Sequence, residues 1–79
     1  MRIDKFLKNS RIIKRRTVAK EACEQGRVLV NGKEAKPGTE LSVGDIIEIN
    51  FGNSNVKAEV LELLEHVPKD KAIDLYKVL

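Results

Sequence analysis

Cationic side chains that could bind phosphate groups are concentrated near the start of this chain. Residues 1–36 contain 11 Lys or Arg and four Asp or Glu, a formal charge of +7, whereas residues 37–79 contain four basic and eight acidic residues, a charge of −4. Guanidinium groups, such as those of the adjacent Arg15 and Arg16, bind phosphate oxygens through paired N–H donors. The first half of the chain is therefore predicted to dock on a polyanion. RNA, DNA and anionic lipid are alternatives at this point, as is a merely solvated charged face.

Residue types that support catalysis are scarce. Cys23 is the only cysteine and His66 the only histidine, so neither an internal disulfide nor a zinc site is expected. Cys23 falls on an apolar helix face and is predicted to be a small core residue. His66, close to Pro68, is predicted to be satisfied or solvent-facing. We therefore expect no catalytic residues, no metal, no cofactor and no enzymatic activity.

The opening residues MRIDKFLKNS carry charges where a signal peptide needs an apolar stretch, and no long apolar run follows. Secretion and membrane insertion are disfavoured. A reducing, cytoplasmic location is expected, and no membrane partner.

Two helices are predicted to position the cations. In residues 3–10, apolar side chains recur at the i, i+3, i+4 spacing of one helix face. Residues 15–26 read as a second helix ended by Gly26, with a narrow apolar arc. Arg15 projects into that arc, so we expect it to snorkel or to lie outside the helix. The apolar positions are Ile3, Phe6 and Leu7 in the first helix and Val18, Ala19, Ala22 and Cys23 in the second.

The exposed face of the second helix also bears on DNA binding. Arg16 and Lys20 lie one turn apart on one border of the apolar arc, whereas Thr17, Glu21 and Glu24 lie opposite. A helix that reads a DNA major groove needs polar, non-acidic side chains across that face. A helix-turn-helix DNA-binding protein is therefore the less favoured alternative.

The period changes from helix to strand after Gly26. Asn31-Gly32, the dipeptide that suits a two-residue type I′ turn, joins two short strands in residues 27–35. Residues 45–51 and 56–64 read as further strands, and from Lys69 onward Ala72, Leu75, Tyr76 and Leu79 have helical spacing. The prediction is an α+β domain: two N-terminal helices packed on a small antiparallel sheet with an Asn-Gly hairpin, and a short C-terminal helix.

Spaced landmarks in residues 1–50 resemble the alpha-L RNA-binding motif, named after the fourth protein of the small ribosomal subunit. They are Arg2-Ile3-Asp4, Leu7, Arg16, Ala19, Gly26, Val28, Val30-Asn31-Gly32, Pro37 and Val43-Gly44-Asp45. The stretch RIDKFLKNSRIIKRRTVAKE and the ending AIDLYKVL further resemble the RqcP family of small ribosome-associated quality-control proteins. The resemblance implies one domain over 1–79, with a motif core of about 1–50 and a C-terminal strand and helix in 56–79.

The resemblance also implies function and partners. RqcP-like proteins bind large-subunit rRNA and stabilise peptidyl-tRNA on the stalled large subunit while RqcH adds a C-terminal alanine tail. RqcH is thus a candidate direct partner, and a monomer is expected. The heat-shock-type family that recycles large subunits is an alternative, although its members typically have a longer basic C-terminal extension than this sequence shows.

The common motif has Ser-Arg where this chain has Arg15-Arg16, which removes a helix-capping hydroxyl and adds a cation. Asp4 is expected either to orient an arginine, with Arg16 the candidate, or to pair with Lys8 one turn on. The aromatic residues Phe6, Phe51 and Tyr76 fit core positions, so base stacking is expected to be minor. The predicted RNA-binding residues are Arg2, Lys5, Lys8, Arg11, Lys14, Arg15, Arg16, Lys20 and Lys33.

Overall fold

The computed structural model describes residues 1–79 and begins with two short helices. Helix α1 spans Ile3–Asn9 and α2 spans Arg16–Glu24, each slightly shorter than predicted. Gly26, with a φ of +73°, ends α2 as expected. Its N–H donates to the Cys23 carbonyl (3.0 Å) and the Arg27 N–H donates to the Ala22 carbonyl (2.9 Å). These two bonds form a Schellman motif, which satisfies the last carbonyls of the helix.

The strands form one antiparallel sheet in the order β2-β1-β3-β4-β5. The predicted hairpin is confirmed: Val30 pairs with Lys33, and Asn31 and Gly32 both have positive φ angles, 51° and 84°. The strands are β1 (Val28–Val30), β2 (Lys33–Glu34), β3 (Ile46–Asn50), β4 (Asn55–Val60) and β5 (Tyr76–Val78).

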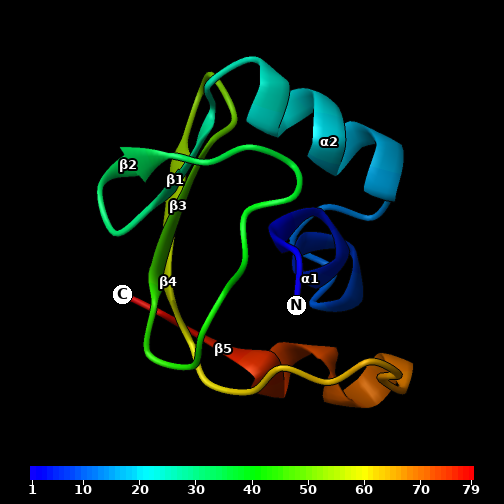
Figure 1. Cartoon of the computed structure of the whole chain (residues 1–79). Helices are drawn as coiled ribbons and strands as arrows, with labels where there is room; N and C mark the ends of the chain where they lie inside the picture. The colour runs from blue at the N-terminus through cyan, green and yellow to red at the C-terminus, as the bar shows by residue number, and fades with distance from the viewer.

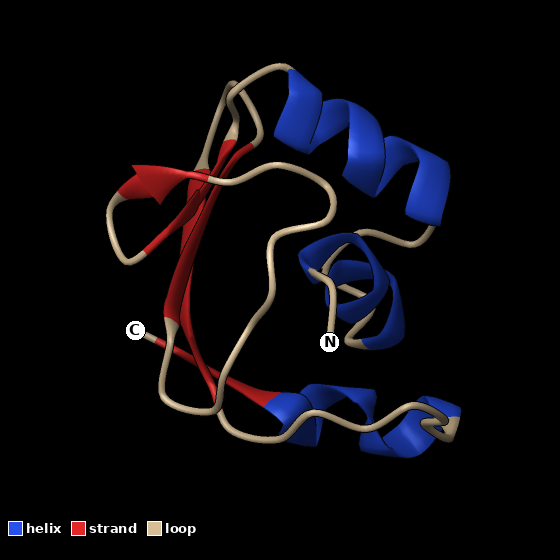
Figure 2. Cartoon of the chain, viewed as in Figure 1, coloured by secondary structure: helices blue, strands red, loops and turns tan.

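One face of the sheet carries the whole core. Figure 1 shows α1, α2 and the C-terminal 3-10 helix η1 (Lys69–Leu75) on the same side of the sheet, and Figure 2 shows the loop after β2 on that side too. The opposite face has no covering layer, and Lys57 and Glu59 point to it because their neighbours Ala58 and Val60 are buried. The largest buried apolar side chains are Phe6, Ile3, Leu7, Ile47, Ile49, Leu75, Val28 and Val60.

The C-terminal prediction was correct for Ala72 and Leu75, which are buried in η1, but wrong for the last four residues. Tyr76 starts β5, and Leu79 is largely exposed. Apolar residues at i and i+3 suit a 3-10 helix as well as an α-helix. Tyr76 then lies opposite Val60 of β4, where pairing satisfies the backbone and suits an aromatic side chain. The predicted strand 56–64 ends early, at Val60.

Two predicted core residues lie at the surface. Val18 of α2 is 45% exposed and Phe51, after β3, is 43% exposed. Both line a hollow between α2 and the end of β3, together with Ile12 and Ile49. Ala19, which is fully buried, packs α2 against the core instead. No helix of the structure has both the length and the apolar character needed to cross a membrane.

Candidate nucleic-acid interface

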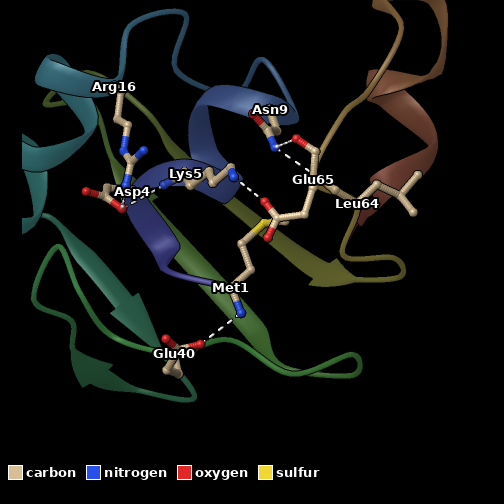
Figure 3. A network of polar contacts seen from close by, with 8 residues as sticks. All are labelled: Met1, Asp4, Lys5, Asn9, Arg16, Glu40, Leu64 and Glu65. Atoms are coloured by element: carbon tan, nitrogen blue, oxygen red, sulfur yellow. Dashed lines mark hydrogen bonds and ion pairs between the residues drawn. The ribbon is translucent and has the colours of Figure 1, made fainter.

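A buried carboxylate organises two arginines at the start of the two helices. Asp4 is fully buried in the first turn of α1. Its Oδ2 accepts a hydrogen bond from Arg2 Nη2 at 3.1 Å, and its Oδ1 accepts one from Arg16 Nη2 at 3.4 Å. The Lys5 backbone N–H donates to the same Oδ1 at 2.8 Å. Of the two expected partners of Asp4, Arg16 is in contact with it (Figure 3), whereas Lys8 forms no ion pair with it.

Both arginines keep much of their surface in water. The side chains of Arg2 and Arg16 are 47% and 44% exposed, although each pairs with a buried carboxylate. A guanidinium has five N–H donors in a rigid plane, and Asp4 takes only one from each arginine. The remaining donors can bind phosphate oxygens, while the carboxylate restricts the rotamers of both side chains.

The loop that follows β2 fixes the position of Arg2. The Ile3 N–H donates to the Thr39 carbonyl at 2.8 Å, and the Leu41 N–H donates to the Met1 carbonyl at 2.9 Å. The N-terminal amine also pairs with Glu40 at 2.8 Å (Figure 3). These contacts hold the start of α1, so that Arg2 precedes the helix in an extended conformation and its side chain can turn back toward Asp4.

Lys5 has a different environment from the other predicted cations. Its ammonium forms an ion pair with the carboxylate of Glu65, which lies in the segment between β4 and η1. The hydrogen bond from Lys5, together with its charge, holds the pKa of Glu65 below its ordinary value of 4.5. The Asn9 side-chain amide donates to the carbonyls of Leu64 (3.0 Å) and Glu65 (3.3 Å) (Figure 3). Lys5 and Asn9 therefore attach this segment to α1.

Three further predicted cations lie together, away from Asp4. Lys8, Arg11 and Lys14 line one hollow, whose other wall includes His66. All three side chains are exposed, and none forms an ion pair. No local pattern indicates that His66 lies beside them, since 52 residues separate it from Lys14.

The other predicted residues are exposed at separate positions. Arg15 lies just before α2 and makes no capping bond, as expected for a residue that replaces a serine. Lys20 lies one turn beyond Arg16 on α2. Lys33 lies in the edge strand β2 and is not brought together with the helical cations (Figure 1).

Asn31 has a structural role that its sequence motif did not reveal. Its side-chain amide donates to Asp45 Oδ1 at 3.1 Å, and its Oδ1 accepts the Ile46 N–H at 2.9 Å. Asp45 in turn accepts the Ser42 N–H at 2.8 Å. The two polar landmarks therefore attach the hairpin to the turn before β3.

Cys23 is buried as predicted, and burial raises the pKa of its thiol to about 11, with smaller contributions from Asp4 and Glu24. A neutral, enclosed thiol is a poor nucleophile, which fits a core role.

Comparison with known proteins relates this architecture to a family. A model of the S4 domain matches residues 1–47. The chain is 55% identical over 78 residues, 99% of its length and 89% of the relative, to the RQC P-site tRNA stabilizing factor of Halalkalibacterium halodurans. It is 46% identical to the protein of the same name from Bacillus subtilis, covering 100% of this chain and 92% of the relative.

Solved structures have the same fold. The trimeric structure of heat shock protein 15 from Vibrio cholerae aligns with a TM-score of 0.93 at 28% identity, over 100% of this chain and 81% of that one. A solution structure of a hypothetical protein aligns with a TM-score of 0.85 at 32% identity, over 100% and 96%. The predicted α+β fold and family are confirmed: the chain belongs to the S4 domain family and, within it, to the family of RQC P-site tRNA stabilizing factors.

Proposed function

We propose that this chain is a non-catalytic RNA-binding factor of bacterial ribosome-associated quality control. It binds large-subunit rRNA and stabilises peptidyl-tRNA on the stalled large subunit during RqcH-mediated alanine tailing. The relatives named RQC P-site tRNA stabilizing factor support this role. The structural observation that carries it is the Arg2–Asp4–Arg16 cluster, in which one buried carboxylate holds two half-exposed guanidinium groups.

The chemistry of this cluster suits structured RNA. Two guanidinium groups held at fixed positions can match phosphates whose spacing is set by RNA folding. Arg15 and Lys20 extend the cationic surface along α2. Phe51 is the one substantially exposed aromatic side chain, too few for a stacking platform that reads successive bases. We therefore expect recognition by shape and phosphate position, with an affinity that falls steeply with salt.

The whole chain acts as one cytoplasmic, monomeric RNA-binding domain in this proposal. The segment 64–65 contacts the first helix, so residues beyond the motif core support the same surface as the motif core. RqcH is the proposed protein partner on the large subunit.

Sedimentation with purified large ribosomal subunits tests the proposal. Arg16→Gln should lower the bound fraction, because it removes one of the two oriented guanidinium groups. Lys57→Gln is the matched control, since it removes one positive charge from the uncovered face of the sheet. Equal co-sedimentation of Arg16→Gln and the unmodified protein would refute the role given to the cluster. Stronger binding to duplex DNA than to tRNA at equal salt would refute the RNA assignment.

A heat-shock-type recycling factor for large subunits is a second candidate, favoured by the close structural match to heat shock protein 15. Alanine tailing in a reconstituted reaction separates the two. The quality-control role requires that tailing by RqcH on stalled large subunits depends on this chain, whereas a recycling factor would leave tailing unchanged.

A further inference from the structure

The hollow lined by Lys8, Arg11, Lys14 and His66 is built from two distant parts of the chain. It measures about 530 Å³ and lies between the end of α1 with its connector to α2 and the segment before η1. Its lining is almost entirely polar or charged. The remaining residues that line it are Asn9, Glu65, Val67 and Pro68.

The second wall of the hollow is attached to the first by specific contacts. The Asn9 amide donates to two consecutive carbonyls, those of Leu64 and Glu65, and the Lys5 ammonium pairs with the Glu65 carboxylate (Figure 3). These contacts set the position of His66, the next residue. The arrangement of cations and imidazole is therefore part of the fold, and does not depend on a ligand to assemble it.

Arg11 is held in an unfavourable backbone conformation at this site. Its φ is +61°, in the left-handed region, where the Cβ of any residue other than glycine crowds the neighbouring backbone. Its N–H donates to the Lys8 carbonyl at 3.1 Å, and the Ile13 N–H donates to the Leu7 carbonyl at 3.1 Å. The chain reverses at Arg11 to place its side chain beside the other cations.

The charges in this hollow are not compensated within the molecule. Lys8, Arg11 and Lys14 form no ion pair, and the one carboxylate that lines the hollow, that of Glu65, is paired with Lys5. Like charges around one hollow repel each other, and a bound anion removes that repulsion. The ammonium, guanidinium and imidazole N–H donors are all suited to phosphate oxygens.

We infer that this hollow is a second phosphate site, which binds the backbone of RNA separately from the Arg2–Asp4–Arg16 cluster. The inference rests on the proposed function as an RNA-binding factor. In the cluster, each guanidinium is oriented by a carboxylate, whereas the cations of the hollow need the ligand as their counter-ion. Two such sites would hold RNA at two separate points on the protein surface.

Amide and histidine NMR spectra recorded with increasing inorganic phosphate test the site directly. Saturable shifts are expected for Asn9, Arg11 and the His66 ring, and sodium chloride at equal ionic strength should not reproduce them. Lys14→Gln should weaken phosphate binding roughly fivefold or more. Arg11→Asn removes the cation but tolerates the positive φ, so it should weaken binding without unfolding. Lys77→Gln is the control that should bind phosphate as before, because Lys77 of β5 does not line this hollow or any hollow that Arg11 lines.

The salt dependence of tRNA binding gives the second measurement. Lys14→Gln removes one phosphate contact. The slope of log affinity against log salt concentration should therefore become shallower by about one. If the unmodified protein binds tRNA, but Lys14→Gln keeps the same slope and phosphate shifts do not saturate, the second site is refuted and the proposed function stands. If phosphate saturates the hollow but neither tRNA nor large subunits bind, the proposed function is refuted, and with it RNA as the ligand of the hollow.

Discussion

Replacing Asp4 by Asn separates orientation from charge as the source of RNA affinity. The change keeps the shape of the side chain but removes the negative charge that holds Arg2 and Arg16. On charge alone, the variant is more positive by one unit and should bind RNA more tightly. If orientation of the two guanidinium groups matters more, it should bind more weakly. The two explanations therefore predict opposite signs.

The structure favours weaker binding. Fixing a long side chain at an interface costs about 0.5–1.5 kcal/mol, and Asp4 restricts two arginines before RNA arrives, so its loss should cost about 2 kcal/mol in total. The gain from charge is smaller, because a phosphate beyond the guanidinium groups lies in water, where two unit charges interact by at most about 1 kcal/mol. The expected result is binding weaker by about 1 kcal/mol, or roughly fivefold.

Fluorescence titration of tRNA at fixed salt measures this difference. Glu24→Gln is the matched control: it removes one negative charge from an exposed carboxylate of α2 that makes no ion pair, and should bind equally or slightly more tightly. Circular dichroism at the assay temperature checks that both variants are folded. Tighter binding by Asp4→Asn, equal to that of Glu24→Gln, would refute the orientation argument.

Three further predictions concern stability and reactivity. A denaturant titration should show that Asn31→Ala lowers the free energy of unfolding by about 2 kcal/mol, because two side-chain hydrogen bonds are lost and alanine is strained at positive φ. Asn31→Gly lacks that strain and should lower it by about half as much. Because the pKa of Glu65 is lowered, its ion pair with Lys5 contributes fully to the stability of the fold above pH 4.5 and is lost as the pH falls through the lowered value. The NMR signals of the Asn9 amide, which binds the same segment, should then shift in acid. Unchanged signals would contradict the attachment of the segment 64–65 to α1. With its pKa at about 11, Cys23 should be alkylated roughly 100-fold more slowly in the native protein than in denaturant, and equal rates would show that the thiol is not enclosed.

Local patterns predicted the parts of the fold that depend on neighbours in sequence. The Asn31-Gly32 hairpin and the end of α2 at Gly26 follow from backbone preferences of single residues, and both are observed. The change from helix to strand at Tyr76 was missed, because it depends on pairing with Val60 of β4. The exposure of Val18 was missed for a similar reason: a helical arc shows which residues share a face, but not which of them the rest of the fold covers.

The candidate site divides in the same way. The proximity of Asp4 to Arg16 could be expected from the motif, whereas the attachment of Glu65 to Lys5 joins residues 60 positions apart and has no local signal. That attachment gives Lys5 a partner within the protein, unlike Lys8, Arg11 and Lys14, which form no ion pair.

The uncovered face of the sheet offers a place for a reporter group. Both proposed phosphate sites use the helices, their connector or the segment docked on α1, all of which lie on the other side of the sheet (Figure 2). Cys23 is the only native thiol and is buried, so a dye would react selectively with a cysteine introduced as Lys77→Cys, on the exposed position opposite Glu59. Single-molecule experiments could then follow arrival and departure of the protein on ribosomal particles without placing the dye in the interface.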